Sequence, residues 1–506
     1  MTAEPTEPPA AHLLSRRAGA ITLAICTLYV VALAYPVHLH VVGVFSDFYR
    51  WYAPDADRIS AGEFPRNTYN PPGYPLLLSL VSPLTGDHFT SGKWISLLAA
   101  GLTGVMAFHL HRRLFGAAPA FLAVPIILSS HTFTTYAISA MTDVPFLCVC
   151  LAALLAIISE RPGGWRSATL SGVLCGTAYL IRYNGVFLLA PGLAGAIWSR
   201  GTRTSRAKQT AVYLGAFLLT VAPWGWLNYT HHGSPVYSTN YQDVARELIV
   251  QGDGRVFTSL TDVLLSNPGR LAWSYARHVG FTLVNTFGAS LALLPVGPLA
   301  ALGIALSLVR HRRRPVLLVL AGTLSFLLLM SLTHWDKRYF LFLLACYSGF
   351  AAVAILQIAQ TIGHPLRSPT AARVVVAALA LVILIPSSER AWRVVRTTLE
   401  RQPIELLPAA RYLNRVAPPG ATVMAVRAQI AYLSHRPWRE LPPAGSVDQL
   451  RAILRERPPD YLVYDRWGRF RKQLTALAKP DGSIPWLQPV YSDASVVVYA
   501  VQLDRR

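Results

Sequence analysis

The chain has 506 residues, of which 53% are hydrophobic and only 14% are charged, too little charge to solvate a globular protein of this size. This composition predicts an integral membrane protein. The net charge of +21, from 46 Lys and Arg against 25 Asp and Glu, does not indicate nucleic-acid binding, because the basic residues fall mostly in short clusters between apolar runs. The five cysteines all lie in apolar runs, which indicates neither a disulfide framework nor a zinc site.

Residues 1–16 begin with a stretch rich in Pro, Ala and Glu, which predicts a disordered cytoplasmic tail. The apolar run after Arg17 contains Ala32-Leu33-Ala34, which would also suit the cleavage site of a signal peptide. Because the run continues to Phe45, we expect a first membrane span instead.

Apolar runs recur through residues 17–387, and we expect about eleven spans in this transmembrane domain. Short Arg-rich loops alternate with longer loops, of which the first covers residues 41–92. By the positive-inside rule, the Arg-rich loops and the N-terminus are cytoplasmic and the long loops are external. This predicts a multi-pass protein of the inner (cytoplasmic) membrane. The expected spans are 17–40, 93–110, 117–131, 144–159, 168–181, 185–198, 210–228, 280–309, 316–333, 339–360 and 374–387.

From Ser388 onward, prolines and charges interrupt the hydrophobicity, which predicts a soluble extracytoplasmic domain over residues 388–506. The runs ATVMAV, DYLVYD and SVVVYA predict short strands, and SVDQLRAILRER predicts an amphipathic helix. The expected fold class is mainly α, a polytopic helical membrane protein with a C-terminal α/β domain. No catalytic group stands out in that domain, so packing or partner docking is its simplest role.

Asp47 stands almost at the end of the first apolar run, where a carboxylate is either solvated at the interface or retained for function. Alone, Asp47 could simply end a helix, with its aromatic neighbours forming an interfacial belt. Asp55 and Asp57 follow in a predicted surface helix, and Asn70-Pro71-Pro72-Gly73-Tyr74-Pro75 predicts a rigid turn. These features favour a structured loop packed on the membrane surface over a floppy connector.

A second acid, Asp143, opens the fourth span in TDVPF on the same external side. It could cap that helix, because Asp accepts hydrogen bonds from exposed N–H groups and Pro suits a first turn. An Asp in this position can cap the helix and serve a site at the same time.

Cations on the external side complete the pattern. Arg182 and Tyr183 lie between two apolar half-spans, and Lys337 and Arg338 precede another span. Guanidinium groups form strong hydrogen bonds with phosphate oxygens, and an unpaired cation near hydrocarbon is costly. These cations therefore favour a binding site for a lipid phosphate. Snorkelling towards lipid head groups is the alternative, chiefly for Lys337.

These residues lie in stretches that resemble the GT-C superfamily, the polytopic glycosyltransferases that use polyprenyl-phosphate sugars. The resemblance is strongest to protein O-mannosyltransferases and lipid A aminoarabinose transferases. It spans most of the chain and rests on Asp47 with the following GEFP and YNPPGYPLLL, on TDVPF, on GTAYLIRYNGVFLLAP and on KRYFLF.

The resemblance implies an active site at the external membrane face, roofed by the first loop and the C-terminal domain. Asp47 would be the catalytic base, and Asp143 the second acid that helps to hold a divalent metal or the acceptor. Arg182 and Arg338 would contact the donor phosphate. The full set of expected substrate contacts is Arg182, Tyr183, Lys337, Arg338, Tyr74, Asp55 and Asp57.

The chain departs from the protein O-mannosyltransferases in having Phe48 where they carry a second acid. Its C-terminal domain also differs from their added sugar-binding domain. The sugar and the acceptor, whether a lipid, a glycan or a protein, therefore stay open. If a metal takes part, the resemblance implies Mg²⁺ or Mn²⁺, with Asp47 and Asp143 as candidate ligands.

The reaction that these residues would perform is inverting sugar transfer to a hydroxyl group, which needs a base for the acceptor and positive charge for the leaving phosphate. A transporter or flippase for a lipid-linked precursor is the alternative, and it predicts mid-membrane acids and repeated halves, which the sequence lacks. A non-catalytic scaffold would explain the C-terminal domain but not the grouped acids and arginines.

Overall fold

The structure is a computed structural model and describes residues 9–159, 164–199, 201–249, 257–288, 291, 295–310, 313–363, 369–466 and 469–503. Of the tail predicted to be disordered, residues 1–8 lie outside the described residues. From Pro9 onward the chain is already helical, as part of α1 (Pro9–Leu39), so the prediction of disorder is wrong for residues 9–16.

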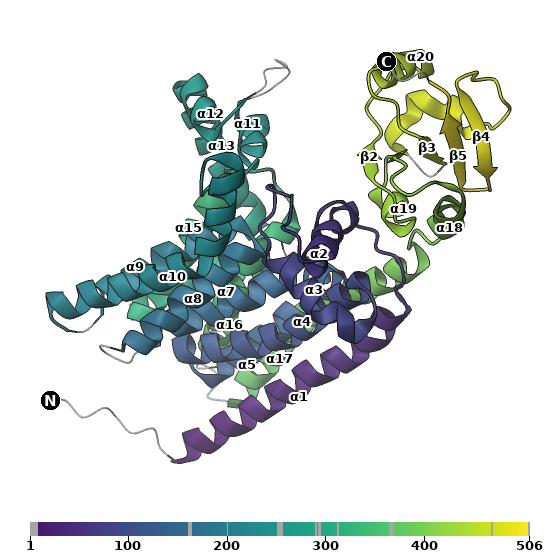
Figure 1. The fold of residues 1–506 in the computed structure, drawn as a ribbon. Coiled ribbons are helices and arrows are strands. Elements are labelled where there is room, and N and C mark those ends of the chain that lie inside the picture. Colours follow the sequence, from purple (N-terminus) through teal and green to yellow (C-terminus); the bar gives the residue numbers. More distant parts are fainter. Residues whose placement is uncertain are drawn as a thin grey trace. The chain divides into compact units, whose positions relative to one another are not determined.

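The chain forms two compact units, whose elements are labelled in Figure 1. The helical unit comprises Met1–His38, Arg66–Leu77 and Thr90–Thr397. The mixed unit comprises Leu39–Pro65, Leu78–Phe89 and Thr398–Arg506. Much of the predicted first external loop therefore belongs to the same compact unit as the C-terminal residues.

Within the described residues, five helices are long and apolar enough to cross a membrane. They are α1, α4 (His88–Phe115), α10 (Arg203–His232), α16 (Leu341–Gly363) with the preceding turn η3 (Lys337–Phe340), and α17 (Pro369–Glu400). The pair α5 (Ala117–Leu128) and α6 (His131–Ala137), bent by 68°, would be a sixth span. The total of about eleven stays a prediction, because the remaining apolar helices are shorter. These are α3 (Gly73–Thr85), α7 (Asp143–Ile157), η2 (Tyr183–Leu188) with α9 (Leu189–Ile197), α14 (Val296–Arg310) and α15 (Arg314–Met330).

The span predicted over residues 280–309 is wrong, because that stretch holds parts of two helices. α13 (Pro268–Phe287) ends before Gly288, and α14 begins directly after Pro295. A helix that ran on from α13 through Pro295 would lack one backbone hydrogen bond there, because proline has no N–H, although the side chains remain apolar. Hydropathy alone does not report this break.

Small residues let the helices of this unit approach closely. α8 (Trp165–Ile181) packs against α10, and a Cβ added at Gly176 of α8 would lie 2.6 Å from Cβ of Thr220. Association of apolar helices in lipid depends on such close packing, because burial of apolar surface supplies little driving force there. The remaining helices of the unit are α11 (Tyr241–Leu248) and α12 (Leu260–Ser266). Both lie within residues 229–279, the second of the predicted long loops.

The mixed unit contains a five-stranded sheet in the order β2-β1-β3-β5-β4. β1 pairs in parallel with β2 and β3, whereas β5 is antiparallel to β3 and β4. The three predicted strands are confirmed as β1, β3 and β5, and the predicted helix as α20 (Val447–Arg455), but β2 and β4 were not predicted. The strands are β1 (Val423–Ala425), β2 (Trp438–Glu440), β3 (Tyr461–Asp465), β4 (Leu487–Ser492) and β5 (Val496–Val501).

Both faces of this sheet are covered, as the alternation of its strands requires. Val423, Val463 and Val498 pack in one core with residues of α18 (Leu406–Val416) and α19 (Ala428–Leu433). Leu462 and Val497 face the opposite core, which includes residues of α20 and η4 (Arg469–Ala478). The domain boundary predicted at Ser388 lies inside α17, which continues to Glu400.

We expect Gly176→Val to destabilise the helical unit by about 2 kcal/mol, because the added side chain would force α8 away from α10. Gly215→Val in α10 is the matched control, since a Cβ there meets nothing within 4 Å. Thermal unfolding of the purified proteins in detergent measures the stability loss in both variants. Equal loss of stability in the two variants would contradict the close packing at Gly176.

Candidate active site

The predicted site residues divide between the two units. Arg182, Tyr183, Lys337, Arg338, Tyr74 and Asp143 lie in the helical unit, whereas Asp47, Asp55 and Asp57 lie in the mixed unit. Each group is therefore described by itself, and the convergence of Asp47 with Asp143 and Arg338 stays a prediction.

Asp143 and Arg182 form an ion pair at one end of the helical unit. Arg182 Nη1 donates to Asp143 Oδ1 at 2.7 Å and to Thr142 Oγ1 at 3.1 Å. The Asp143 side chain is only 1% exposed, and its second oxygen, Oδ2, has no hydrogen-bond partner among the described residues. A buried carboxylate oxygen without a hydrogen-bond partner is unfavourable, so the charge of Asp143 depends on its pairing with Arg182.

The local backbone explains how these two residues meet. Asp143 is the first residue of α7, and Thr142 takes the N-cap position without a side-chain capping bond. The carboxylate of Asp143 therefore gains from the positive end of the helix while it binds Arg182. Arg182 is the extended residue between α8 and η2, and Gly185 lets η2 fold back against Ala178.

Two predicted cations share one aromatic ring. The guanidinium carbon of Arg182 lies 4.9 Å from the ring centre of Tyr339, and that of Arg338 lies 4.8 Å from it. Arg338 also donates to the Tyr339 hydroxyl at 2.9 Å and pairs with Asp336 at 3.3 Å. The negative face of the ring reduces the repulsion between the two nearby positive charges.

Tyr339 lies inside KRYFLF, and His334 and Asp336 shortly precede it, but none of the three was predicted as a site residue. His334 Nε2 is 3.5 Å from the Tyr339 hydroxyl. Burial is the main cause that lowers the pKa of His334, and the positive charge of Arg338 contributes, so the imidazole is neutral at pH 7. The histidine adds a neutral hydrogen-bonding group beside the two arginines.

The other predicted residues of the helical unit lie in different surroundings. Lys337 Nζ is 3.1 Å from His131 Nε2 in an exposed contact. The Tyr183 hydroxyl accepts a hydrogen bond from Trp224 Nε1 at 3.0 Å. Tyr74 is fully buried and packs beside Gly92, which favours a structural role over the predicted contact with substrate.

A further bond in this unit joins the loop predicted over residues 41–92 to α11. The Tyr69 hydroxyl donates to Asp243 Oδ2 at 2.5 Å, and Arg246 pairs with the other oxygen of Asp243. Asp243 is buried in α11. No local pattern predicts a bond between residues so distant in the sequence, and only the fold reveals it.

In the mixed unit, Asp47 is half-buried and occupies the N-cap position of the π-helical turn η1 (Phe48–Tyr52). Such π-helical turns are rare in proteins, and those that occur are often found at functional sites. Phe48 and Tyr49 are buried, and their rings lie 5.6 Å and 5.9 Å from that of Phe89. The aromatic residues directly after Asp47 thus pack in a cluster with Phe89.

The other two predicted acids lie in α2 (Ala53–Ser60), which confirms the predicted helix. Asp55 is buried, whereas the Asp57 side chain is 56% exposed and pairs with His88 at 3.1 Å. Burial, followed by the negative charge of Asp57, raises the pKa of Tyr432. Tyr432 therefore stays a neutral hydroxyl at physiological pH.

The donor set gives little support for a metal. Among the described residues, no group of three or more His, Cys, Asp or Glu side chains is arranged as metal ligands. Asp143, a candidate ligand, already lies against the positive charge of Arg182. We therefore derive no step through a metal ion.

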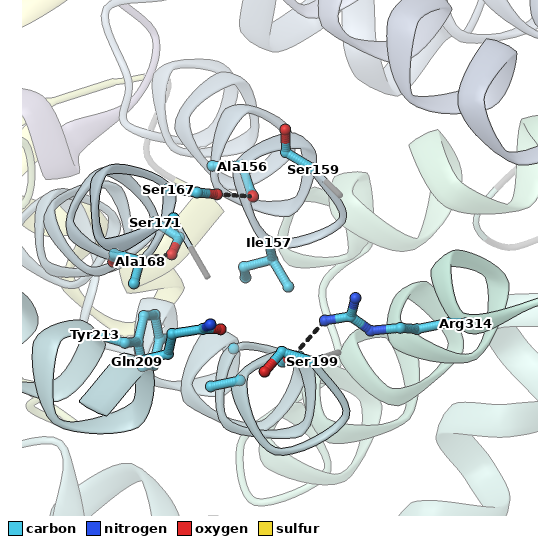
Figure 2. A pocket seen from close by; sticks show the side chains of 14 residues that line it. Ala156, Ile157, Ser159, Ser167, Ala168, Ser171, Ser199, Gln209, Tyr213 and Arg314 are labelled. Atoms are coloured by element: carbon cyan, nitrogen blue, oxygen red, sulfur yellow. Dashed lines mark hydrogen bonds between the residues drawn. The ribbon is translucent and has the colours of Figure 1, made fainter. Parts of the chain in front are cut away.

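The hollow in Figure 2 is a different place in the helical unit. It is lined mostly by small and polar side chains of α7, α8, α9 and α10, with Arg314 of α15. Because it includes Ile157, the last residue of α7, it lies roughly 20 Å along that helix from Asp143. It contains none of the predicted site residues.

Comparison with known proteins gives a family match over part of the chain. Residues 69–226 match the sequence model of the dolichyl-phosphate-mannose-protein mannosyltransferases. This stretch contains Tyr74, Asp143, Arg182 and Tyr183. The comparison with curated protein sequences gives no match.

Solved structures match over most of the chain. ArnT from Cupriavidus metallidurans bound to undecaprenyl phosphate is 15% identical, with a TM-score of 0.59 over 95% of this chain and 97% of ArnT. The oligosaccharyltransferase AglB from Archaeoglobus fulgidus, in complex with an inhibitory peptide and a dolichol-phosphate, is 12% identical, with a TM-score of 0.60 over 88% of this chain and 69% of AglB. The arabinofuranosyltransferase AftD from Mycobacteria is 17% identical, with a TM-score of 0.50 over 97% of this chain and 40% of AftD.

We expect Asp143→Asn to lower the stability of the helical unit by about 2 to 3 kcal/mol, because Arg182 would keep its charge in a largely buried place. The exposed pair of Arg393 and Glu389 is the matched control, and Glu389→Gln should cost under about 0.5 kcal/mol. Chemical unfolding of the purified variants measures both values.

A double-mutant cycle with Arg182→Gln sharpens this test. The double variant should be more stable than Asp143→Asn alone, since no charge is left unpaired. Strictly additive losses would show that the two side chains do not depend on each other.

The matches to solved structures show the fold, and the predicted fold class is confirmed. The protein is a multi-pass membrane protein with the fold of the GT-C glycosyltransferases.

Proposed function

We propose that the protein is a glycosyltransferase that moves a sugar from a polyprenyl-phosphate donor to a hydroxyl acceptor. We place the reaction at the extracytoplasmic face of the inner membrane, with the N-terminus in the cytoplasm. The observation that carries the proposal is the pair of largely buried guanidinium groups, Arg182 and Arg338, on the ring of Tyr339. They occur in a fold shared with ArnT bound to undecaprenyl phosphate.

A lipid phosphate needs this kind of site. Each guanidinium group carries five N–H donors in a planar fork, so one carboxylate partner does not exhaust it. The carboxylates of Asp143 and Asp336 stabilise the two cations before the donor arrives. The phosphate can then bind to positive groups that are already ordered, which reduces the entropic cost of binding.

The proposed reaction is a single displacement. The carboxylate of Asp47 takes the proton of the acceptor hydroxyl while its oxygen attacks the anomeric carbon of the sugar. The bond between that carbon and the phosphate oxygen breaks, and the phosphate leaves with the electron pair. Attack from the opposite face inverts the anomeric configuration. Arg182 and Arg338 stabilise the negative charge that develops on the leaving phosphate.

The comparisons support a lipid-linked donor more than any particular sugar or acceptor. The family match names a mannosyltransferase, whereas the matched structures include an oligosaccharyltransferase and an arabinofuranosyltransferase. We therefore leave the acceptor as a lipid, glycan or protein hydroxyl. No observation favours the alternative of a flippase.

We expect Asp47→Asn to lower the rate of sugar transfer by about 10²-fold or more, because the amide cannot accept the proton. The rate is measured with purified protein and undecaprenyl-phosphate-linked mannose and arabinose as donors. Asp481→Asn, an exposed carboxylate in the same unit, is the control and should keep the wild-type rate. Near-normal transfer by Asp47→Asn would remove Asp47 from the mechanism.

We expect Arg338→Ala to weaken binding of undecaprenyl phosphate at least about tenfold, because a charge-assisted contact is lost. Arg393→Ala, which removes a 70% exposed side chain, should leave binding unchanged. Titration of each protein with undecaprenyl phosphate in nanodiscs measures the affinity. Equal affinities in wild type and Arg338→Ala would place the phosphate elsewhere.

A further inference from the structure

The segment that carries Asp47 has little regular structure of its own. α1 ends at Leu39 and the next helical residues begin at Ser46, so residues 40–45 make few regular backbone hydrogen bonds. Backbone N–H and C=O groups nevertheless need partners when they are removed from water. In this segment, several of those partners are side chains from the C-terminal part of the mixed unit.

Gln402, which follows α17, binds the beginning of the segment. Its Oε1 accepts hydrogen bonds from the backbone N–H groups of Val41 at 2.7 Å and Val42 at 3.2 Å. Its Nε2 donates to the carbonyl of Leu39 at 3.3 Å. One amide side chain thus binds backbone groups of the last residue of α1 and of two residues shortly after it.

Gln429 of α19 binds the second half of the segment. It is only 1% exposed. Its Nε2 donates to the carbonyl of Gly43 at 3.3 Å, and its Oε1 accepts from the hydroxyl of Ser46 at 3.3 Å. Ser46 directly precedes Asp47, so this contact is the last one from the C-terminal residues before the proposed base.

Contacts after Asp47 hold the other side. The ring of Tyr49 lies 5.6 Å from that of Tyr432, and the Tyr49 hydroxyl accepts from the Gly43 N–H at 2.8 Å. Arg50 pairs with Glu440 at 3.2 Å, and its guanidinium carbon lies 5.0 Å from the ring centre of Trp438. The backbone is therefore fixed both before and after Asp47.

From these contacts we infer that Gln429 is a positioning residue for Asp47 and that the C-terminal α/β domain holds the catalytic base in place. The inference rests on the proposed function of Asp47. A general base must lie within hydrogen-bond reach of the acceptor hydroxyl, and a misplacement of about 1 Å can cost 10²-fold in rate. Gln429 meets this need by fixing Gly43 and Ser46 together.

The test uses Gln429→Met in the full-length protein, because Met has a similar volume but cannot form either hydrogen bond. Turnover of undecaprenyl-phosphate-linked mannose and arabinose should show kcat lowered about tenfold with an unchanged KM for the donor. Amide hydrogen exchange over residues 41–47 should become faster, while the Tm stays within the range of the control. Gln488→Met is the control, because Gln488 is exposed on β4.

Ser46→Ala adds a second, milder variant that removes only one of the two bonds. It should lower kcat less than Gln429→Met does, and it should have no further effect when combined with Gln429→Met. A merely structural glutamine would lower the Tm without this dependence between the two positions.

The outcomes separate the inference from the proposed function. Unchanged exchange over residues 41–47 in Gln429→Met would overturn the structural part of the inference. Faster exchange with normal kcat would overturn the positioning role while leaving the enzyme assignment intact. If neither the wild type nor Asp47→Asn turned over either donor, both the proposed function and the positioning role would be contradicted. The amide hydrogen exchange of residues 41–47 would still decide whether Gln429 holds the segment.

Discussion

The ion pair of Asp143 and Arg182 fixes the geometry of the polar end of the helical unit. It joins the first residue of α7 to the residue that follows α8, and it places the guanidinium group of Arg182 against Tyr339. The guanidinium group of Arg338 also contacts the ring of Tyr339. Without the carboxylate of Asp143, two neighbouring cations would repel each other in a partly buried place, at a cost that the aromatic ring alone would not offset.

In the mixed unit, the corresponding constraint is the order of the irregular segment just before Asp47. The sheet of the C-terminal residues is a rigid support, since both of its faces are covered by apolar cores. The helices on one face then offer amide and aromatic side chains to the segment around Asp47. Many of the contacts that order this segment come from a separate part of the chain.

Sequence patterns predicted what depends on local periodicity. The strands β1, β3 and β5 and the helix α20 follow from their alternation of apolar residues, and the polytopic fold class follows from composition. The break at Pro295 and the short strand β2 were missed, because the first is hidden in an apolar run and the second has only three residues. The residues of the candidate site were recognisable in the sequence as charged side chains at the ends of apolar runs. Their partners, such as Tyr339 for the arginines and Asp243 for Tyr69, depend on the tertiary fold.

The bonds of Gln402 also have a consequence for biosynthesis. Val41 leaves the ribosome 361 residues before Gln402 does. At about 5–20 residues per second, the glutamine is made roughly 20 to 70 seconds after the valine. During that interval the membrane helices can insert, but the backbone before Asp47 lacks the side chains that order it. The segment before Asp47 therefore gains these contacts only after the long apolar helices, of which α17 is the last, have been synthesised.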